Sequence, residues 1–392
     1  MKRAVWPLAS IAAIALAALP AAAHPVRIGR YAEIPYGIRP DHPYPTASGG
    51  PRRTGRQDAV APAREPQRVW ERTLRHRRLR GPAIAADGTL YFGTNDGLTA
   101  VGPDGVERWS VRLGTVPATP SLVPSDDVVV VTRGGLVAVV TRDGTVRHTA
   151  DLGAPARGSP LVLDDGSILA ATIDRRVHRL DASLRRVFSV EVADSAGTTL
   201  SRTTRGLIAV PGGRTLALLE PTGRIVREVA LAQRTSSSAA VADDGTLWLP
   251  TPEGLLLAID ASGRVRSRTE LGGRYYDGAA IAVGRDGAVR VPTLDRGVVC
   301  VGPGGTERWR HTAGQGYNAP ATVDREDTTL VVDRVGQMFA IARDGTERWR
   351  VHIEPYTLQA PVLGADGTIY VATEAGTLQA WRDTATSGSE PP

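Results

Sequence analysis

The chain contains few cysteines, few lysines and few aromatic residues, and these scarcities narrow its class. Cys300 is the single cysteine among 392 residues, which excludes an intramolecular disulfide framework. Lys2 is the single lysine among 47 basic residues, and the 41 acidic residues are interspersed with the arginines, for a formal net charge of +6. A balance this mild and this mixed leaves no basic stripe, so we expect no nucleic-acid partner.

Long hydrophobic runs are missing except at the start of the chain. Residues 5–19 are mostly apolar, the basic pair Lys2-Arg3 precedes them, and Ala21-Ala22-Ala23 follow. This pattern is typical of a Sec-type signal peptide and is too short for a membrane span. We therefore expect residues 1–23 to be a signal peptide. The protein should be exported, to the periplasm or out of the cell, with no transmembrane segment and no lipid-anchor cysteine.

One segment recurs eight times at intervals of 38 to 42 residues. Residues 81–109 are the clearest copy, and residues 159–188, 319–349 and 360–381 repeat the pattern with substitutions. One position of the repeat is occupied in turn by Pro82, Pro120, Pro160, Leu200, Ala239, Ile281, Pro320 and Pro361. A period near 40 residues with four short strands per copy is typical of a β-propeller. We predict an all-β, eight-bladed propeller of four-stranded antiparallel blades over residues 67–383.

Asp-Gly pairs mark turns between the strands of the copies. Eight pairs recur, beginning at Asp87, Asp104, Asp143, Asp165, Asp244, Asp286, Asp344 and Asp366. We interpret them as tight hairpin turns in which both residues have a positive φ. The stretches between turns are apolar or alternating, which indicates short strands. Proline near the start of a copy indicates that the innermost strand is an edge of its sheet.

The eighth copy is shorter than the others. It stops after its third strand, near Trp381, so its blade lacks a fourth strand. The segment VWERTLRH, residues 69–76, precedes the first copy. We predict that this segment supplies the missing strand and closes the ring, which would hide two sheet edges. The blades that carry a tryptophan at the same place are then neighbours, namely those of Trp70, Trp109, Trp309 and Trp349.

The repeat resembles that of quinoprotein-type, or PQQ-like, propellers. Residues 100–109 and 340–349, which run from an alanine through an Asp-Gly turn to a tryptophan, are similar to that family's tryptophan-docking motif. In the family, this tryptophan and alanine lock adjacent blades together. The resemblance covers residues 68–382. The family includes alcohol dehydrogenases that bind pyrroloquinoline quinone and non-catalytic members such as the lipoprotein subunit of the outer-membrane barrel-assembly machinery, and this chain resembles the non-catalytic members more.

The resemblance to the dehydrogenases implies requirements that this sequence does not meet. Such an enzyme needs a calcium ion held by carboxylate and amide side chains, an acidic base and, commonly, a cap of two adjacent cysteines over the quinone. A single cysteine excludes the cap, and copies of 38 to 42 residues leave no long insertions to build the pocket. The histidines show no metal-ligand spacing, and no nucleophile elbow or phosphate loop is present. We expect no cofactor, no metal and no catalytic residues.

Residues 24–66 differ from the repeats. They are rich in proline and arginine and show little apolar periodicity, so we interpret them as an irregular linker or arm. Within them, residues 49–56 (GGPRRTGR) resemble a short segment that often precedes such propellers in bacterial envelope proteins. The simplest interpretation of residues 24–66 is a disordered segment with no specific task, and the alternative is that the part near residues 49–56 packs against the propeller. Residues 384–392 we expect to be a disordered tail.

The loops that enter the innermost strands of the last blades are rich in tyrosine. These loops share one phase of the repeat, so we expect them to meet at one rim of the channel. Tyrosine and arginine are typical of binding hot spots. The candidate binding residues are Tyr276, Asp277, Tyr317, Asn318, Tyr356 and Gln359 on the last blades, and Arg80 and Arg157 on the opposite arc.

Together, these features favour an exported, non-catalytic and monomeric scaffold that binds a protein or a cell-envelope glycan through its loop face. Two alternatives stay open. One is a degenerate or divergent quinoprotein-type enzyme, and the other is a purely structural envelope component. A buried carboxylate cluster in the central channel would favour the enzyme.

Overall fold

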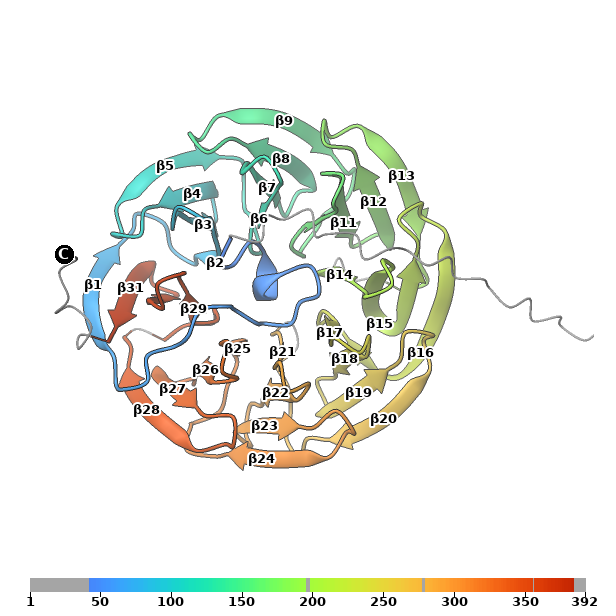
Figure 1. The fold of residues 1–392 in the computed structure, drawn as a ribbon. Helices are drawn as coiled ribbons and strands as arrows, with labels where there is room; N and C mark the ends of the chain where they lie inside the picture. The colour runs from blue at the N-terminus through green and yellow to red at the C-terminus, as the bar shows by residue number, and fades with distance from the viewer. Residues whose placement is uncertain (1–41, 195–197, 277–278, 355, 384–392) are drawn as a thin grey trace, which may run out of the picture. The chain divides into compact units, whose positions relative to one another are not determined.

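Eight antiparallel sheets stand around a central channel as the blades of a propeller (Figure 1). The computed structural model describes residues 42–194, 198–276, 279–354 and 356–383, all of which belong to one compact unit, Glu33–Pro392. The expected signal peptide and the expected tail lie outside the described residues. No helix within these described ranges is long and apolar enough to cross a bilayer. The predicted all-β, eight-bladed fold is confirmed.

Blades 1 to 4 are built in chain order from the channel outward. Their strands are β2 (Arg80–Ile84), β3 (Leu90–Gly93), β4 (Gly97–Val101) and β5 (Glu107–Arg112); β6 (Ser121–Leu122), β7 (Val128–Val131), β8 (Leu136–Val140) and β9 (Val146–Asp151); β10 (Leu161–Val162), β11 (Ile168–Thr172), β12 (Arg176–Leu180) and β13 (Arg186–Glu191); and β14 (Ser201–Arg202), β15 (Ile208–Leu219) and β16 (Ile225–Thr235). In blade 4, the long β15 covers the positions that two strands occupy elsewhere.

Blades 5 to 7 follow the same order, and blade 8 takes its outermost strand from the start of the repeat region. Their strands are β17 (Ala240–Val241), β18 (Leu247–Pro250), β19 (Leu255–Ile259) and β20 (Val265–Glu270); β21 (Ala282–Val283), β22 (Val289–Pro292), β23 (Val298–Val301) and β24 (Glu307–His311); β25 (Thr322–Val323), β26 (Thr329–Val332), β27 (Gln337–Ile341) and β28 (Glu347–His352); and β29 (Val362–Leu363), β30 (Ile369–Ala372), β31 (Thr377–Arg382) and β1 (Gln67–Thr73).

The sequence pattern of each strand follows its distance from the channel. Second strands such as β7, with the sequence VVVV, are completely buried because a neighbouring blade covers each face. Outermost strands such as β20 alternate between half-buried and exposed residues because only one side of the strand faces a neighbour. Apolar side chains between the blades therefore form the core, in clusters that each span two adjacent sheets.

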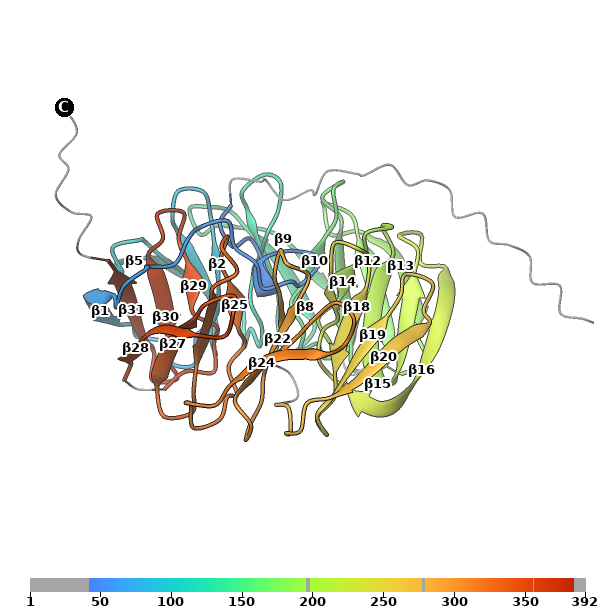
Figure 2. The ribbon, with the colours of Figure 1, turned by 60° about the horizontal axis from the view of Figure 1, so that its bottom comes forward.

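The antiparallel order gives the ring two distinct ends. Loops that enter the innermost strands and loops between the second and third strands lie at one end, which we call the entry face. Turns between the first and second strands and between the third and fourth strands lie at the other end, the turn face. The strands run between these two faces in each blade (Figure 2).

The Asp-Gly turns differ in one respect from the prediction. Gly88 has a φ of 79°, but Asp87 does not have a positive φ. The Gly88 N–H donates to the Ala85 carbonyl at 2.9 Å, and Asp87 Oδ1 accepts the Thr89 N–H at 3.0 Å. The loop is thus a turn of three residues with glycine last, and only the glycine needs the left-handed region. The aspartate-to-backbone hydrogen bond recurs in all eight turns.

Strand β1 closes the ring, as predicted. It pairs antiparallel with β31, with Arg72 opposite Leu378, and lies on the outer side of that strand (Figures 1 and 2). Trp70 on β1 packs beside Tyr370 on β30, with ring centroids 6.0 Å apart. Closure of the ring therefore depends on hydrogen bonds and packing between the two ends of the repeat region, where the chain provides no covalent link.

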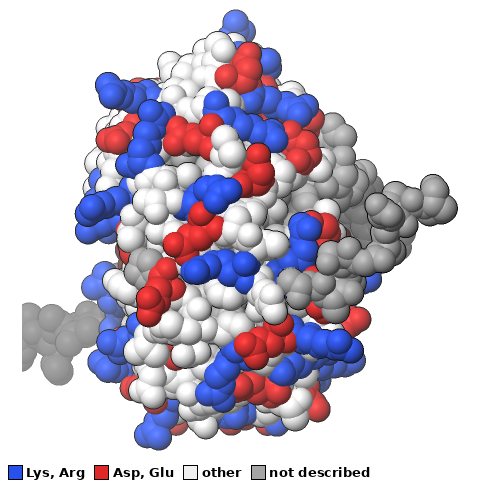
Figure 3. Space-filling view, turned by 90° about the vertical axis from the view of Figure 1, so that its left-hand side faces the viewer, with Lys and Arg blue, Asp and Glu red and all other residues white. Residues whose placement is uncertain are grey.

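The outer surface over β1 carries arginine and acidic side chains in alternation (Figure 3). Arg68 pairs with Glu71 at 2.5 Å, and Arg75 pairs with Glu107 at 2.6 Å. Exposed pairs of this kind contribute little to stability. On this side of the molecule, the charges neutralise one another locally and leave no broad patch of one sign.

Tryptophan side chains join adjacent blades on one arc of the ring. The ring of Trp109 on β5 lies so close to Gly144 of blade 2 that a methyl group built on this glycine would be 2.8 Å from it. The indole Nε1–H donates to the Arg142 carbonyl at 2.7 Å. Trp309 contacts Gly345 and donates to the Arg343 carbonyl, at 2.9 Å, in the same way. Each junction thus needs a glycine under the indole.

The junctions on either side of blade 8 follow the same principle with different partners. Trp70 lies against Gly105 of blade 1. Trp349 of blade 7 donates from Nε1 to the Pro62 carbonyl at 2.7 Å, because blade 8 has no turn between its third and fourth strands to receive it. We call the four junctions made by Trp309, Trp349, Trp70 and Trp109 the tryptophan arc. The predicted neighbourhood of these four blades is confirmed.

The remaining junctions form what we call the mixed arc, made by His148, Phe188, Arg227 and Ser267. Phe188 lies on Gly223 as a smaller aromatic ring. Between blades 2 and 3, both partners are exchanged. His148 stands at the tryptophan position, and the buried Leu184 stands at the glycine position with a φ of 61°. Leu184 packs into the inter-blade core in place of an indole.

Residues 42–62, which we call the channel segment, pass through the channel (Figure 1). The innermost strands are sheet edges, and the segment accepts or donates hydrogen bonds along them. Its carbonyls accept the N–H groups of strands in six blades, and the Gln57 side chain bonds both backbone groups of Leu363 in blade 8. The carbonyl pairs are Tyr44 with Ile84, Pro45 with Leu122, Pro51 with Arg202, Arg52 with Val241, Thr54 with Val283 and Gly55 with Val323.

Arg53 is the most buried cation of the channel segment, with an exposed fraction of 1%. Its guanidinium donates to the carbonyls of Leu200, Pro160 and Ala47 and to Thr46 Oγ1, at 2.8 to 3.3 Å. It thereby reaches blades 3 and 4 and holds the short 3-10 helix η1 (Ala47–Gly49). None of the described carboxylates pairs with it. Burial lowers the pKa of Arg53 to about 9, against an opposing contribution from Tyr44.

Candidate binding site at the channel mouth

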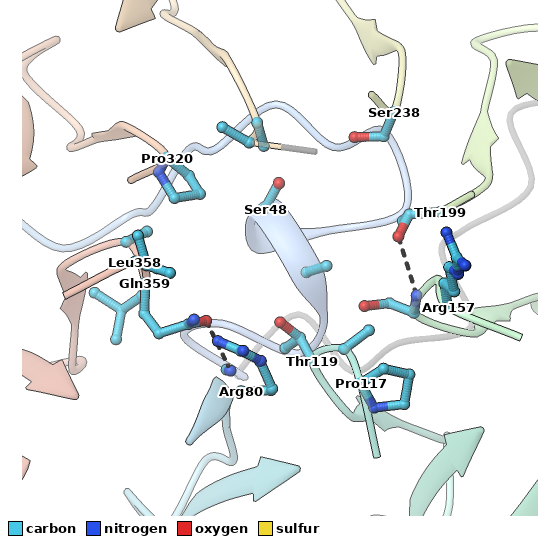
Figure 4. Close-up of a pocket in the computed structure, with 18 of the residues that line it drawn as sticks. Ser48, Arg80, Pro117, Thr119, Arg157, Thr199, Ser238, Pro320, Leu358 and Gln359 are labelled. Carbon is cyan, nitrogen blue, oxygen red and sulfur yellow. Dashed lines mark hydrogen bonds between the residues drawn. The ribbon is translucent and has the colours of Figure 1, made fainter. Parts of the chain in front are cut away.

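The entry face has a pocket of about 350 Å³ at the mouth of the channel. Every blade contributes at least one lining residue, so the pocket lies on the axis of the ring. Tyr44, Ala47 and Ser48 of the channel segment form its floor, and Ser48 stands in the middle of the view in Figure 4. Because this segment closes the channel below, the pocket is a cup and not a passage.

One half of the cup wall carries hydroxyl groups. The residue directly before the repeat position marked by Pro120, Pro160, Leu200 and Ala239 points into the cup in four consecutive blades, 2 to 5. These residues, which we call the hydroxyl half, are Thr119, Ser159, Thr199 and Ser238. Figure 4 labels Thr119, Thr199 and Ser238. Thr199 Oγ1 accepts the Ser159 N–H at 3.0 Å. The side-chain hydroxyls of Ser159, Thr119 and Ser238 bond no residue that the structure describes.

The other half of the wall carries small or apolar residues. The same repeat position is Ala280 in blade 6, Ala360 in blade 8 and Gly81 in blade 1. Pro320 and Leu358 complete this small half. Across the width of the cup, hydroxyls therefore face a wall of small and apolar residues that is interrupted by Gln359 and Arg80.

Arg157 and Arg80 stand at the rim of the cup. Arg157 enters from blade 3, beside the hydroxyl half, and makes no ion pair with any described residue (Figure 4). Arg80 enters from blade 1 and pairs with Glu374 at 3.2 Å. Gln359 of blade 8 lies next to it, with its Oε1 accepting the Gly81 N–H at 3.3 Å. No carboxylate is present among the described lining residues, so the site has an excess of positive charge.

Four of the eight predicted site residues line this pocket. They are Tyr276, Gln359, Arg80 and Arg157, from blades 6, 8, 1 and 3. Tyr276 is 42% exposed at the rim. Tyr356 is 46% exposed on the same face but does not line the pocket, and Asp277 lies outside the described residues.

The structure places Tyr317 and Asn318 differently from the expectation that they face a partner. Tyr317 is completely buried, and its ring meets Phe339 edge-on with centroids 6.2 Å apart. Burial raises the pKa of its hydroxyl above the ordinary value. Asn318 is half-buried, and its Oδ1 makes no hydrogen bond to a described residue. The ring of Tyr317 turns inward and packs in the inter-blade core with Val298, Val331 and Phe339.

Sequence reasoning missed the hydroxyl half and the floor. A signal for the hydroxyl half was present, since threonine or serine occupies one repeat position in four consecutive copies. The floor had no such signal. Ser48 reaches the cup through a φ of 52° and a ψ of 38°, and only the path of the channel segment brings it there.

The residues of the cup do not fit a calcium-bound quinone. A calcium ion needs several oxygen ligands, with carboxylates prominent among them. The lining residues that the structure describes offer no carboxylate, and Gln359 Oε1 is already occupied by an N–H. No group of three or more His, Cys, Asp or Glu side chains in the described ranges is arranged to hold a metal. Cys300 is completely buried on β23.

One almost completely buried carboxylate lies near the turn face. Asp286 is bound by Arg290 at 2.6 Å, and both side chains are almost completely inaccessible. Arg308 adds a second contact to Asp286 at 3.0 Å, and Arg343 of blade 7 approaches it at 3.6 Å. Burial by itself would raise the pKa of Asp286, but the hydrogen bond and charge of Arg290, the Ala288 N–H and the charge of Arg308 outweigh it and lower the pKa. This cluster joins blades 6 and 7, and Asp286 already has three arginine partners.

Comparisons with known proteins agree with this architecture. The family model described as "Outer membrane protein assembly factor BamB" matches residues 58–226 and 295–389, more than half of the chain. No curated protein matches the sequence. Among solved structures, BamB from Moraxella catarrhalis superposes with a TM-score of 0.66 at 16% identity, and the match covers 83% of this chain and 100% of that one.

Dehydrogenase structures share the same fold. A europium-containing methanol dehydrogenase has a TM-score of 0.69 at 12% identity, with 86% of this chain and 90% of that chain covered. Quinohemoprotein alcohol dehydrogenase from Comamonas testosteroni has a TM-score of 0.73 at 12% identity, with 91% and 82% covered. Identities this low indicate a common fold and nothing finer. On the family match, this chain belongs to the PQQ-like propellers of the outer membrane protein assembly factor BamB family.

Proposed function

We propose that the chain is an exported, non-catalytic scaffold of the cell envelope that binds a protein or a glycan partner through its entry face. The observation that carries the proposal is the closed channel. Residues 42–62 bond to the innermost strands around the ring, and the cup above them offers no described acid or base to a reaction. A protein built this way presents shape, hydroxyls and cations, which serve recognition and not chemistry.

The entry face also carries the exposed aromatic residues that recognition uses. Tyr276 and Tyr356 are 42% and 46% exposed, and both stand on loops that enter the last blades. A tyrosine provides a large amphipathic contact at low ordering cost, because it has two side-chain torsions. Tyr356 is anchored by its backbone, since its carbonyl accepts the Glu374 N–H at 3.3 Å. These residues replace Tyr317 as the candidate anchors, because Tyr317 is buried.

The test is capture of an envelope partner by the chain without residues 1–23. The partner is identified by cross-linking, and its affinity is then measured. The double variant Tyr276→Ala, Tyr356→Ala should bind this partner with an affinity about 30-fold lower, as expected for a loss of ~2 kcal/mol at a hot spot. The matched control is Val106→Ala, Val146→Ala, which removes two exposed apolar residues near the turn face. Equal retention by all three proteins would contradict the proposal and favour a purely structural component.

A second measurement addresses the enzyme alternative. With added pyrroloquinoline quinone and calcium, the purified protein should show no dye-linked oxidation of alcohols or sugars, because the cup lacks the ligand set described above. Calcium-dependent binding of the quinone at micromolar concentration would overturn the proposed function.

A further inference from the structure

We propose that the cup binds an acidic sugar residue of an envelope glycan, with the carboxylate on Arg157 and the hydroxyl half, and the sugar ring against the small half. This inference rests on the proposed function and specifies the ligand chemistry for one part of the entry face. It follows from the charge, the hydroxyl pattern and the dimensions of the site.

Charge favours an anion. Arg157 and Arg80 stand at the rim, and Glu374 neutralises only Arg80. Arg53 lies beneath the floor with four neutral oxygen acceptors and no described carboxylate partner. A buried cation without a counter-ion leaves a positive potential that a bound anion would reduce. The energetic gain is larger here than on an open surface, because the surrounding protein screens less than water.

The position of Arg157 sets the place of the carboxylate. It lies in blade 3, and the hydroxyl half extends from blade 2 to blade 5 on either side of it (Figure 4). A carboxylate held by a guanidinium makes short, charge-assisted hydrogen bonds, and it has further lone pairs for neighbouring hydroxyls. Ser159 and Ser238 have hydroxyls that bond no described residue, so they are available as donors.

The dimensions and the amphipathic wall favour a sugar over a small inorganic anion. A volume of about 350 Å³ is at the lower end of the range for small-molecule pockets. A single phosphate or sulfate would occupy the cationic side and leave the small half unused. A pyranose ring has hydroxyls along its edge and C–H groups on its faces, which match the hydroxyl half and the wall of Ala280, Pro320 and Leu358. Tyr276 at the rim can stack on a second sugar.

Two envelope sources carry this chemistry, and the experiment separates them. Glucuronic acid represents acidic polysaccharides, and N-acetylmuramic acid represents the peptidoglycan sugar. Their neutral counterparts are glucose and N-acetylglucosamine, and inorganic phosphate is the small anion. Binding to the chain without residues 1–23 is measured by calorimetry and saturation-transfer NMR at low salt. At least one acidic sugar should bind about tenfold tighter than its neutral counterpart, in line with one charge-assisted contact.

Variants show whether the contact is in the cup. Arg157→Gln should weaken acidic-sugar binding by about tenfold and abolish the preference for acid over neutral sugar. Ser238→Ala should weaken binding a few-fold. The matched control is Arg334→Gln, an exposed arginine of the same face that does not line the cup and carries the same charge change. All variants must keep the melting temperature of the parent, which is expected because Arg157 is exposed.

The outcomes distinguish this inference from the proposed function. Equal binding of acidic and neutral sugars, binding of phosphate as tight as that of the sugar, or equal affinity in Arg157→Gln would overturn the acidic-sugar site. If no sugar binds while the tyrosine variant loses its envelope partner, the inference is wrong and the scaffold proposal stands. Preference for pyrroloquinoline quinone over every sugar would overturn both.

Discussion

The tryptophan arc and the mixed arc use the same repeat but connect their blades differently. On the tryptophan arc, an indole lies on a glycine or against the channel segment, and three of the four indoles donate to a backbone carbonyl of the next element. On the mixed arc, a phenylalanine, an arginine, a serine and a histidine take the same position. Only Phe188 there offers a ring to the glycine beneath it.

The difference follows the location of the seam in the ring. Blade 8 is assembled from both ends of the repeat region, and its junctions on both sides belong to the tryptophan arc. The mixed arc lies in the continuous part of the chain, where covalent connections already keep neighbours close. Both junctions of the blade that contains the seam therefore carry a tryptophan, at the place where separation of β1 from β31 would expose two sheet edges.

The largest effect should come from removing the seam strand. Deletion of residues 68–76 takes away most of β1 and Trp70, exposing the edge of β31 and the apolar surface around Tyr370. We expect loss of the cooperative thermal transition or insoluble protein, measured by circular dichroism against the chain without residues 1–23. A melting temperature within a few degrees of that of the parent would show that the seam strand is dispensable. It would contradict the argument that the tryptophan arc stabilises the seam.

Truncation of one aromatic residue should lower the free energy of unfolding more on the tryptophan arc than on the mixed arc. Trp349 is almost fully buried and donates to Pro62, so Trp349→Ala should destabilise the protein by ~3–5 kcal/mol. Phe188 is half-buried and is not a hydrogen-bond donor, so Phe188→Ala should cost about half as much. Urea unfolding monitored by fluorescence gives both values. Equal losses would mean that the two arcs contribute alike.

An exchange at the junction of blades 2 and 3 tests whether the tryptophan–glycine pair is portable. Leu184→Gly should destabilise by ~2 kcal/mol, because loss of the buried leucine outweighs relief of its positive φ. His148→Trp alone should also destabilise, since Leu184 occupies the space. The double variant should be more stable than the sum of the two single changes by ~1 kcal/mol or more. Additive effects would show that the introduced indole does not pack on the introduced glycine at this junction.

The smallest effect concerns acid stability. Paired arginines lower the pKa of Asp286 at the junction of blades 6 and 7, so its contribution to stability is present above its ordinary pKa and lost as pH falls through the folded value. From neutral pH toward pH ~2, Asp286→Asn should therefore flatten the decrease in unfolding free energy. The matched control is Asp165→Asn on the mixed arc. That carboxylate is also held by an arginine, but it is largely exposed, so the slope should change less. Identical slopes would contradict the burial argument.

The repeat could be predicted from the sequence because each copy has the same succession of short strands and turns. Four short strands need three turns, and in seven of the eight copies Asp-Gly forms at least one of them, through a carboxylate that accepts a nearby N–H. The strand deficit of the eighth copy could be counted, so the role of β1 could be predicted. The details of the turn could not, because a three-residue loop and a two-residue loop share the same Asp-Gly pair.

The candidate site was less accessible to sequence reasoning. Tyr276, Gln359, Arg80 and Arg157 share one phase of the repeat and line one pocket. The same phase suggested Tyr317, but its ring turns into the core between Val298, Val331 and Phe339. Phase fixes the backbone position of a loop residue, whereas the direction of its side chain depends on the space left by neighbouring blades.

The sequence by itself determined the blade number, the strand order and the closing strand, because each is encoded in local turns and apolar runs that repeat in a countable way. Tertiary structure alone decided the path of residues 42–62 and, with it, the floor of the cup. That path is held mainly by backbone carbonyls, such as those of Pro51, Arg52 and Thr54, which every residue possesses and no side-chain pattern reveals. The unpaired edges of the innermost strands stabilise this path by hydrogen bonding, and these edges line a common channel only once the ring has formed.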